Sequence, residues 1–560
     1  MADPVSIAGI AIAVLEDLIK LGVWTANLVE NVRAFEEDTR NLVVLIESDT
    51  SRTKLLKALL FARLPTYGDR TLFDQFSDDV QRQTSHLLED SKSTLQAAYD
   101  LLARRYAPKS PATPTETDSS PLSPTISRLS LLSTPSYSSR SRSSSSLTTA
   151  ILWSVRDKKR VEGILHKFNE LNVRVEKNVK LWCLANDLGV NIEHLQRLQH
   201  DESSKKLGFD IDATLRLAQQ DAQISTDGLM LDVGWDQALT NFKHLPRTGP
   251  FYEVERKGDT YILEHHAYDP PIWMCGSNSR LDVCGLDSRT KNRVEALAKL
   301  LHQPKELIFR IPPCVGWRYL PEHHAVSFVF EIKPKPAAPP KSLLELLSHR
   351  EQKSGWMPSL GERFQLAAAL SSCIAQLHMV SWLHESLRSE NILFFPDVDP
   401  MALSANDTII DFSSPWIFGF EFSRLDVAIT AAHVDFLPER DIYRHPQRQG
   451  YPEVTFQRIH DIYSLGVILL EIGLWEPAIK LQKNSFLGAN PGNFELIQQQ
   501  LLKHATHRLE KRVGKRYKDV VIRCLKGDFG VTNDNREDLK LQQAFRAQVV
   551  DVLERAASSV

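Results

Sequence analysis

The chain has 560 residues, of which 42% are hydrophobic and 24% are charged. This length allows about two to four domains with cores of their own, and the composition is that of an ordinary globular protein. The formal net charge of -3 and the lack of a long basic run exclude a nucleic-acid partner. The six cysteines form no C-x-x-C pair, so we expect no zinc site and interpret them as free thiols of a reducing compartment.

The N-terminal segment lacks the basic start of a cleavable signal peptide and has Asp3 instead. Apart from Ser6, residues 5–15 are apolar, which is about half the length of a membrane-spanning helix. We therefore expect a cytoplasmic protein that could be recruited to a membrane. Because this run is apolar around the whole helix, it is either a central helix of a bundle or a helix that acts at a membrane surface. The candidate residues for membrane contact or self-assembly are Ile7, Ile10, Ile12 and Leu15.

Two later stretches, residues 73–105 and 153–184, carry apolar residues at three- and four-residue spacing, which predicts helices with one buried face. Between them, residues 108–148 are rich in serine and proline and cannot bury a core, so we expect a disordered insertion. Residues 1–186 are thus predicted to form an all-α helical bundle with this insertion. The insertion is either a passive linker or a phosphorylated segment, whose candidate sites are Ser110, Thr113, Ser120, Ser123 and Thr134.

The opening S-I-A-G-I-A-I-A-V-L-E-D-L-I-K-L-G and the W-S-V-R-D-K-K sequence from Trp153 to Lys159 resemble the fungal HeLo (prion-inhibition and propagation) domain. The resemblance covers residues 1–186 apart from the insertion. It implies a helical bundle with a role in fungal incompatibility or regulated cell death, in which the first helix acts on membranes. It also implies contact with a membrane surface and self-oligomerisation through the N-terminal helices.

The remaining chain divides into two parts. Residues 187–247 are polar with a weak helical pattern, and we expect a linker there. From residue 248 to residue 560, strand patterns come first and long helices follow, which predicts a two-lobed α+β domain. The fold class is therefore multidomain, an all-α bundle followed by an α+β domain. The clearest segments are the β-rich residues 259–265 and 325–332 and the helical residues 363–378 and 461–474.

Three motifs of the second domain resemble protein kinases. The sequence H-E-S-L-R-S-E-N-I-L, residues 384–393, is similar to the kinase catalytic loop, and I-Y-R-H-P, residues 442–446, is similar to the end of an activation segment. The helix H-D-I-Y-S-L-G-V-I-L-L-E follows, and its Asp461 matches the buried aspartate that hydrogen-bonds the catalytic-loop backbone in that family. The resemblance implies a protein-kinase-like fold for residues 248–560.

The catalytic loop itself lacks its base. Ser386 stands where the family has the aspartate that accepts the substrate proton, and a serine hydroxyl is not basic near neutral pH. His384, Arg388 and Asn391 remain from the motif. We expect these remnants to hold the shape of the loop and expect no catalytic residue among them.

The phosphate-binding parts are also altered. The expected glycine-rich loop has only Gly249 and Gly258, without G-x-G-x-x-G spacing. Glu264 or His266 stands where the ATP-pairing lysine belongs, and a carboxylate there would repel phosphate. Glu295 either matches the structural glutamate of the kinase αC helix or is a charge on a solvated helix face.

The metal position has two alignments. Asp411 begins an Asp-Phe-Ser sequence, whereas residues 416–424, W-I-F-G-F-E-F-S-R, resemble the family pattern better overall and place Gly419 there. The literal Asp-Phe-Gly at Asp528 follows the helix of Asp461, so its place in the chain excludes it. We expect no cofactor and no metal; ATP with Mg²⁺ at Asn391 and Asp411 is the alternative.

These observations predict a non-catalytic signalling protein in which a pseudokinase domain binds other proteins and regulates a HeLo bundle. A divergent, active protein kinase that uses Asp411 is the first alternative. A scaffold whose two domains only bind proteins is the second.

Overall fold

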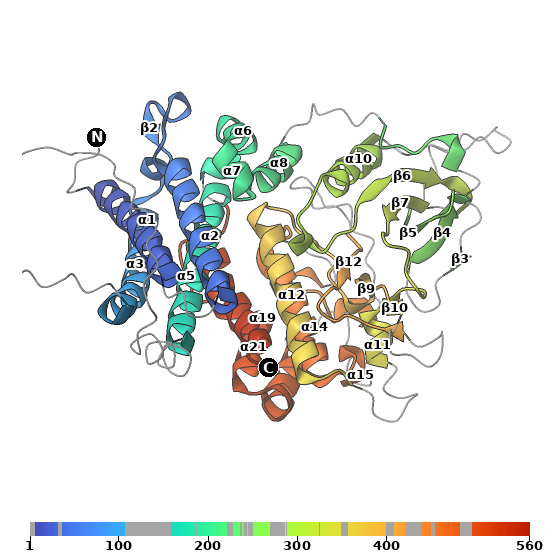
Figure 1. Ribbon diagram of the computed structural model, residues 1–560. Coiled ribbons are helices and arrows are strands. Elements are labelled where there is room, and N and C mark those ends of the chain that lie inside the picture. The colour runs from blue at the N-terminus through green and yellow to red at the C-terminus, as the bar shows by residue number, and fades with distance from the viewer. Residues whose placement is uncertain are drawn as a thin grey trace, which may run out of the picture. The chain divides into compact units, whose positions relative to one another are not determined.

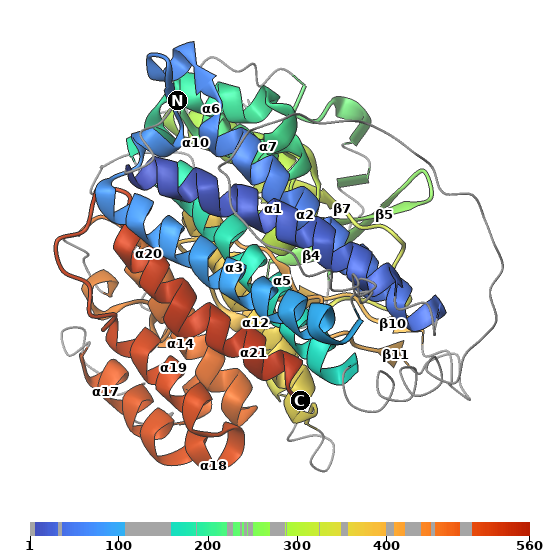
Figure 2. The same ribbon diagram turned by 60° about the vertical axis from the view of Figure 1, so that its left-hand side comes forward.

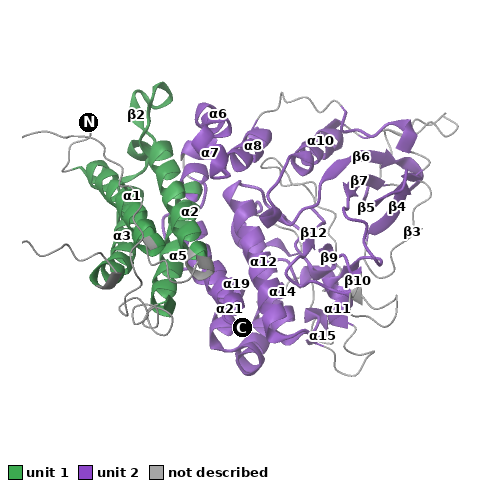
Figure 3. Cartoon of the chain, in the orientation of Figure 1, with its two compact units in different colours: residues 1–180 green, residues 181–560 purple. Residues whose placement is uncertain are grey.

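The computed structural model (Figure 1) describes residues 6–31, 36–106, 158–185, 187–220, 228–235, 238–239, 243–244, 250–268, 286, 288–323, 325–348, 357–398, 408–420, 438–449, 454–481 and 495–560. The chain forms two compact units, Met1–Lys180 (unit 1) and Leu181–Val560 (unit 2), which Figure 3 colours separately. Unit 1 is helical and unit 2 combines helices with small sheets, so the prediction of several domains with a helical region first is confirmed. The five candidate phosphorylation sites lie outside the described residues.

Unit 1 is built from long helices that run alongside one another in both ribbon views (Figures 1 and 2). Helix α1 contacts both α2 and α3, and the α2–α3 connection contains a two-stranded antiparallel ribbon, β1 and β2. The last residues of α5 belong to unit 2. The elements are α1 Ile7–Asn31, α2 Glu36–Phe61, β1 Arg63–Leu64, β2 Arg70–Thr71, α3 Asp78–Tyr106 and α5 Lys158–Leu184.

Helix α1 is packed in the bundle along one face only. Leu15 is fully buried and Ile7 and Ile12 are half-buried, but Ile10 is 41% exposed and Trp24 is 51% exposed. The helix therefore serves as a core helix while it leaves apolar side chains at the surface. Within the described residues, no helix is both long enough and apolar enough to cross a bilayer.

The helices of unit 1 approach one another closely where side chains are small. A Cβ added to Gly22 of α1 would overlap the Thr50 side chain of α2, so a glycine is required at this crossing. Ion pairs tie α1 to its neighbours at the surface, with Lys57 Nζ 2.7 Å from Glu16 and Lys92 Nζ 2.7 Å from Asp17. Exposed pairs of this kind contribute little, so packing at the crossing holds α1 in place.

Unit 2 opens with helices where a linker was expected. Helices α6 Ile192–His200, α7 Glu202–Lys206 and α8 Phe209–Gln220 bury Leu195, Leu198 and Phe209. The Asn191 side chain caps α6 by accepting the backbone N–H of His194, and Asp201 caps α7 by accepting that of Ser204. These caps and a few buried apolar residues make helices out of a sequence whose overall composition is polar.

The largest sheet of unit 2 has five antiparallel strands in the order β3-β4-β5-β7-β6. Helix α10 lies between β5 and β6 in the chain and packs on β6. The predicted strands at residues 259–265 and 325–332 are confirmed as β5 and β7. The elements are β3 Lys243–His244, β4 Phe251–Arg256, β5 Asp259–Ala267, α10 Ser288–His302, β6 Cys314–Leu320 and β7 Ala325–Glu331.

The helical part of unit 2 surrounds α14 Arg458–Leu474, which is buried along nearly its whole length. Helix α12 Leu360–Met379 packs on it after a capping box formed by Ser359 and Glu362. Helix α19 Lys515–Lys526 also packs on α14, where Gly466 lets Cys524 approach closely.

The remaining helices are short. They are α11 Leu343–Ser348, α13 Pro438–Asp441, α15 Ala478–Leu481, α17 Glu495–His504, α18 Glu510–Val513, α20 Leu539–Phe545 and α21 Asp551–Ser558.

Among the described residues of unit 2 there are two further small sheets, one in the order β12-β9-β8 and one that pairs β10 with β11. Their strands are β8 Lys341–Ser342, β9 Ile392–Phe394, β10 Asp397–Val398, β11 Thr408–Ile409 and β12 Trp416–Ile417.

Candidate functional site

The loop that contains residues 384–391 joins α12 to β9 and is almost entirely inside the protein. His384 and Asn391 are fully buried and Ser386 is 7% exposed. A loop so deeply buried must satisfy its backbone groups with fixed partners. Those partners come from α14, from the chain that follows β12 and from side chains of the loop itself.

Asp461 of α14 holds the start of this loop. Its Oδ2 accepts the backbone N–H of His384 at 2.9 Å, and its Oδ1 accepts that of Glu385 at 3.0 Å. This is the arrangement that the resemblance implies for Asp461. Glu385 has a φ of 66°, a left-handed conformation that is unusual for a non-glycine residue, and the two hydrogen bonds stabilise it.

Asp461 is ionised inside the protein. Burial works to raise the pKa of Asp461, but the hydrogen bond from His378 Nε2, at 3.2 Å, and the other donors hold it below its usual value. Burial lowers the pKa of His378, so its neutral ring donates Nε2–H to the carboxylate. The Asp461 carboxylate is thus fully used to shape the loop.

His384 has a defined tautomer for a similar reason. Its Nε2 lies 2.9 Å from the carbonyl oxygen of Phe418 and therefore carries the hydrogen, whereas its Nδ1 accepts the backbone N–H of Ser386 at 3.3 Å. Burial lowers the pKa of His384, which keeps the ring neutral. The ring packs on Phe420 with centroids 4.3 Å apart. His384 is therefore a structural link between the loop and residues 418–420.

The side chains of Asn391 and Arg388 contact neighbours within the loop. Asn391 Nδ2 donates to the carbonyl oxygen of Ser386 at 2.9 Å. The Arg388 guanidinium lies 3.0 Å from the carboxylate of Glu390. Both side chains are therefore engaged in holding the loop.

Gly419 lies directly against Asn391. Strand β12 brings this segment in, and the backbone N–H of Phe418 donates to the Asn391 carbonyl oxygen at 2.9 Å. Gly419 has a φ of 76°, and a Cβ there would overlap the Asn391 amide. A residue with a side chain would therefore be strained and would clash at this position, so an aspartate does not fit in this conformation.

Glu264 of β5 closes the same place from the sheet. Its side chain is 2% exposed, its Oε1 accepts the backbone N–H of Gly419 at 3.1 Å, and His266 Nε2 lies 2.6 Å from the same oxygen. Residues two apart on a strand share a face, which explains why Glu264 and His266 act together. The structure thus brings both candidates for the lysine position to Gly419, beside Asn391.

Asp411 has a different environment. Its carboxylate is at the surface, and its Oδ1 accepts the N–H of Ser413 at 2.8 Å and the Oγ–H of the same residue at 2.6 Å. Partial burial raises its pKa, but the hydrogen bonds from Ser413 and Ser414 outweigh this and lower it. The neighbouring Phe412 packs against Phe394. The described hydrogen bonds of Asp411 therefore stay within its own turn and do not reach the 384–391 loop.

Glu295 lies on α10 and pairs with its own helix. Its Oε1 is 3.8 Å from Lys291 Nζ, one turn earlier, and both side chains are partly exposed. Pairs of this spacing contribute only a few tenths of a kcal/mol, roughly. The described contact is that of a helix-face charge.

One polar group near the loop was not predicted. Glu471 of α14 is fully buried, and its Oε1 accepts the hydroxyl of Tyr443 at 2.7 Å and the backbone N–H of Ala478 at 2.8 Å. The Ser389 hydroxyl donates to the Tyr443 oxygen at 2.7 Å, so this series of hydrogen bonds connects Glu471 to the loop. The sequence signal was the single acidic residue within the apolar run L-L-E-I of α14.

Comparison with known families gives a match for part of unit 2. Residues 295–560 match a family model described as a domain of unknown function (DUF7580), and the match runs from α10 through the rest of unit 2. No curated protein matches the chain. Within the described residues, no group of three or more histidine, cysteine, aspartate or glutamate side chains is placed to hold a metal ion.

Proposed function

We propose that unit 2 is a degenerate protein-kinase-like domain that binds other proteins without transferring phosphate, and that it regulates a HeLo-like helical unit 1. The observation that carries this proposal is the environment of the 384–391 loop. The groups that shape the loop are present, namely Asp461, His384 and Asn391. Ser386, however, stands where protein kinases have the aspartate that accepts the substrate proton.

The order of elements supports the kinase-like part. A five-stranded antiparallel sheet with α10 inserted before β6 comes first, and the loop, the β9–β12 pair and the buried α14 follow. The three kinase-like motifs follow this order of elements: the 384–391 loop comes first, residues 442–446 next and α14 last. The β9–β12 pairing also favours the alignment that puts Gly419 at the metal position, because β12 ends two residues before Gly419 and delivers it to Asn391.

The charges around the loop support the loss of chemistry. Phosphoryl transfer requires cations that neutralise the phosphates. Here the buried Glu264 side chain, which accepts the backbone N–H of Gly419, stands where the resemblance expects the ATP-pairing lysine. A carboxyl group cannot supply the positive charge that pairs with phosphate, so this position lacks the lysine's function.

A second candidate function, that of a divergent kinase, rests on Asp411. This carboxylate is exposed and its lowered pKa keeps it ionised, so it is available as a metal ligand. If the full chain transferred phosphate from ATP and Asp411→Ala abolished the transfer, the pseudokinase proposal would be wrong. Asp528→Ala is the matched control, because Asp528 is also exposed and lies outside the proposed site.

The exposed apolar residues of α1 support an effector role for unit 1. Ile10, Val23 and Trp24 are each more than two-fifths exposed, although α1 is otherwise a core helix. Single exposed apolar residues are common, but several on one helix provide contact area for a lipid surface or a second copy. Together with the HeLo resemblance, this supports a cytoplasmic protein that acts at membranes in incompatibility or regulated cell death.

Release of dye from anionic vesicles tests the effector role. Residues 1–186, with their helical content first checked by circular dichroism, should release dye, and the full chain should release less because unit 2 restrains unit 1. Ile10→Glu should reduce the release, because it places a charge on the exposed face of α1. Val44→Glu is the matched control on α2, where Val44 is 58% exposed. If residues 1–186 release no dye, the scaffold interpretation replaces the effector role.

A further inference from the structure

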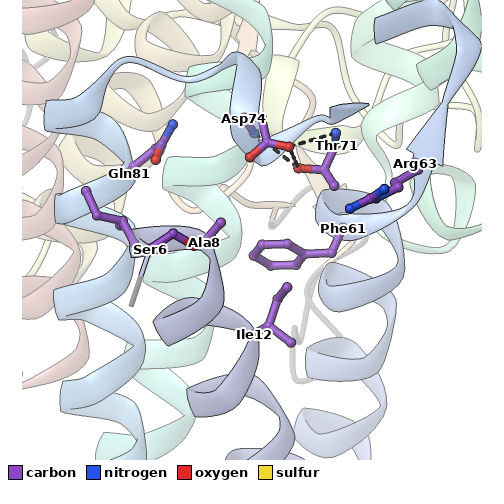
Figure 4. A pocket seen from close by; sticks show the side chains of 9 residues that line it. Ser6, Ala8, Ile12, Phe61, Arg63, Thr71, Asp74 and Gln81 are labelled. Carbon is purple, nitrogen blue, oxygen red and sulfur yellow. Dashed lines mark hydrogen bonds between the residues drawn. The ribbon is translucent and has the colours of Figure 1, made fainter. Parts of the chain in front are cut away.

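Unit 1 contains a cavity of about 480 Å³ at the N-terminal end of α1 (Figure 4). Its apolar wall consists of Ile7, Ala8 and Ile12 from α1 and the ring of Phe61, the last residue of α2. Figure 4 shows the Phe61 ring facing Ala8 and Ile12. These side chains are half-buried, and the volume lies within the range of about 300–1,000 Å³ that small-molecule sites have.

The polar edge of this cavity comes from the β1–β2 ribbon. Arg63 pairs with Thr71 in the antiparallel register, and residues that lie opposite each other in such a pair point to the same face. Leu64 and Arg70 form the neighbouring pair, so they point to the opposite face, and they do not line the cavity. The ribbon thus presents Arg63 to the cavity and keeps Arg70 away from it.

At this edge, Arg63 is the charged residue whose side chain can form an ion pair with a ligand. Asp74 Oδ2 accepts both the backbone N–H of Thr71 at 3.0 Å and its hydroxyl at 2.7 Å, so this carboxylate is used within its own turn. Within the described part of the chain, the Arg63 guanidinium has no hydrogen-bond or ion-pair partner. Figure 4 shows it at the edge, directed toward the side where Phe61 lies.

We infer that this cavity binds a monoanionic amphiphile: its carboxylate pairs with Arg63 and its hydrocarbon chain lies against Phe61 and Ile12. The apolar wall favours burial of a hydrocarbon chain, because this removes apolar surface of both partners from water. The guanidinium favours a carboxylate, with which it forms charge-assisted hydrogen bonds, and disfavours a cationic head. This site is additional to the proposed function and does not depend on any action of unit 1 at a membrane.

Calorimetric titration of the full chain with dodecanoate, dodecanol and dodecyltrimethylammonium, each as a monomer in solution, tests the inference. Dodecanoate should bind most tightly and the cationic amphiphile least. Arg63→Gln should weaken dodecanoate binding about five- to tenfold, the effect of one partly exposed ion pair, and leave dodecanol binding unchanged. Arg70→Gln is the matched control and should change neither, because Arg70 points away from the cavity.

Ala8→Trp tests the position of the hydrocarbon chain. An indole at Ala8 would fill the cavity, so binding of both dodecanoate and dodecanol should be lost while the helical circular-dichroism signal is kept. The inference is wrong if the wild-type chain does not bind dodecanoate, or if Arg63→Gln binds it as tightly as wild type does. The Arg63 comparison decides the matter even if Ala8→Trp does not fold.

The same chemistry occurs in a free fatty acid and in an anionic membrane lipid. Addition of phosphatidylserine vesicles to the dodecanoate complex separates these sources. Dodecanoate also partitions into any bilayer, so phosphatidylcholine vesicles are the matched control. Greater loss of dodecanoate from the protein with phosphatidylserine than with phosphatidylcholine identifies the membrane lipid as the ligand, and equal loss identifies the free carboxylate; either result supports the site. Because the titration itself contains no bilayer, failure of the vesicle-leakage experiment would not affect it.

Discussion

Glu471 is the buried carboxyl group of unit 2 for which the structure makes the sharpest prediction. Burial raises the pKa of Glu471 to about 7, since its described partners are neutral donors and no cation lies among them. The folded protein therefore binds this proton more tightly than the unfolded chain does. The stability that this proton contributes is fully present below about pH 4.5 and is lost as the pH rises through about 7.

Glu471→Gln should remove this pH dependence, because glutamine resembles the protonated side chain. The free energy of unfolding of the variant relative to wild type should increase by about 3 kcal/mol between about pH 4.5 and about pH 8. Urea unfolding across this pH range, followed by circular dichroism, measures the difference. A difference that does not change with pH would contradict the assignment.

At the scale of residues, the residues of the site could be identified from the sequence, but their contacts could not. His384, Ser386, Asn391 and Asp461 were found because they occur in a motif of fixed spacing. The contact of Glu264 with Gly419 joins residues far apart in the chain, so no local pattern could indicate it. Periodicity reports which face of an element is buried but not which distant backbone group a buried carboxylate meets.

At the scale of elements, the crossing of α1 and α2 makes a stability prediction. Gly22→Ala should lower the free energy of unfolding by about 1–3 kcal/mol, because the added methyl group overlaps the buried Thr50 side chain. Gly163→Ala is the matched control on α5, where a Cβ meets nothing within 4 Å. This control should raise stability by up to about 1 kcal/mol, because alanine favours the helix.

Chemical denaturation of both variants, followed by circular dichroism, measures the two effects. Opposite signs would establish that α1 is held by close contact with α2. If Gly22→Ala were as stable as Gly163→Ala, α1 would not be packed at this crossing as described.

Elements were predictable where many residues repeat one pattern. The long helices α3, α5, α12 and α14 and the strands β5 and β7 lie where apolar spacing indicated them. Helices α6–α8 did not stand out, because their stability comes from caps and from distant contacts such as Gln376 Nε2 with Asp212 Oδ1 at 2.7 Å. The two-residue strands β1 and β2, which form the edge of the unit 1 cavity, are too short to carry any periodic signal.

At the scale of the whole molecule, the chain combines a helical unit that leaves apolar residues of α1 exposed with a unit built around α14. Helices α6–α8 belong to unit 2, where Arg216 of α8 lies 3.5 Å from Glu537. The segment that follows unit 1 in the chain, beginning with the end of α5, is thus part of unit 2. The proposed regulation of unit 1 requires such a connection, and the last residues of α5 provide it, because they belong to unit 2.

The central claim is that unit 2 has a kinase-like framework without phosphoryl-transfer chemistry. Calorimetric titration of the full chain with ATP, with and without Mg²⁺, tests it most directly. The proposal predicts no Mg²⁺-dependent binding, because Glu264 stands where the kinase resemblance expects the ATP-pairing lysine and Gly419 supplies no carboxylate for a metal. Tight, Mg²⁺-dependent binding of ATP, accompanied by transfer of its terminal phosphate, would contradict the claim.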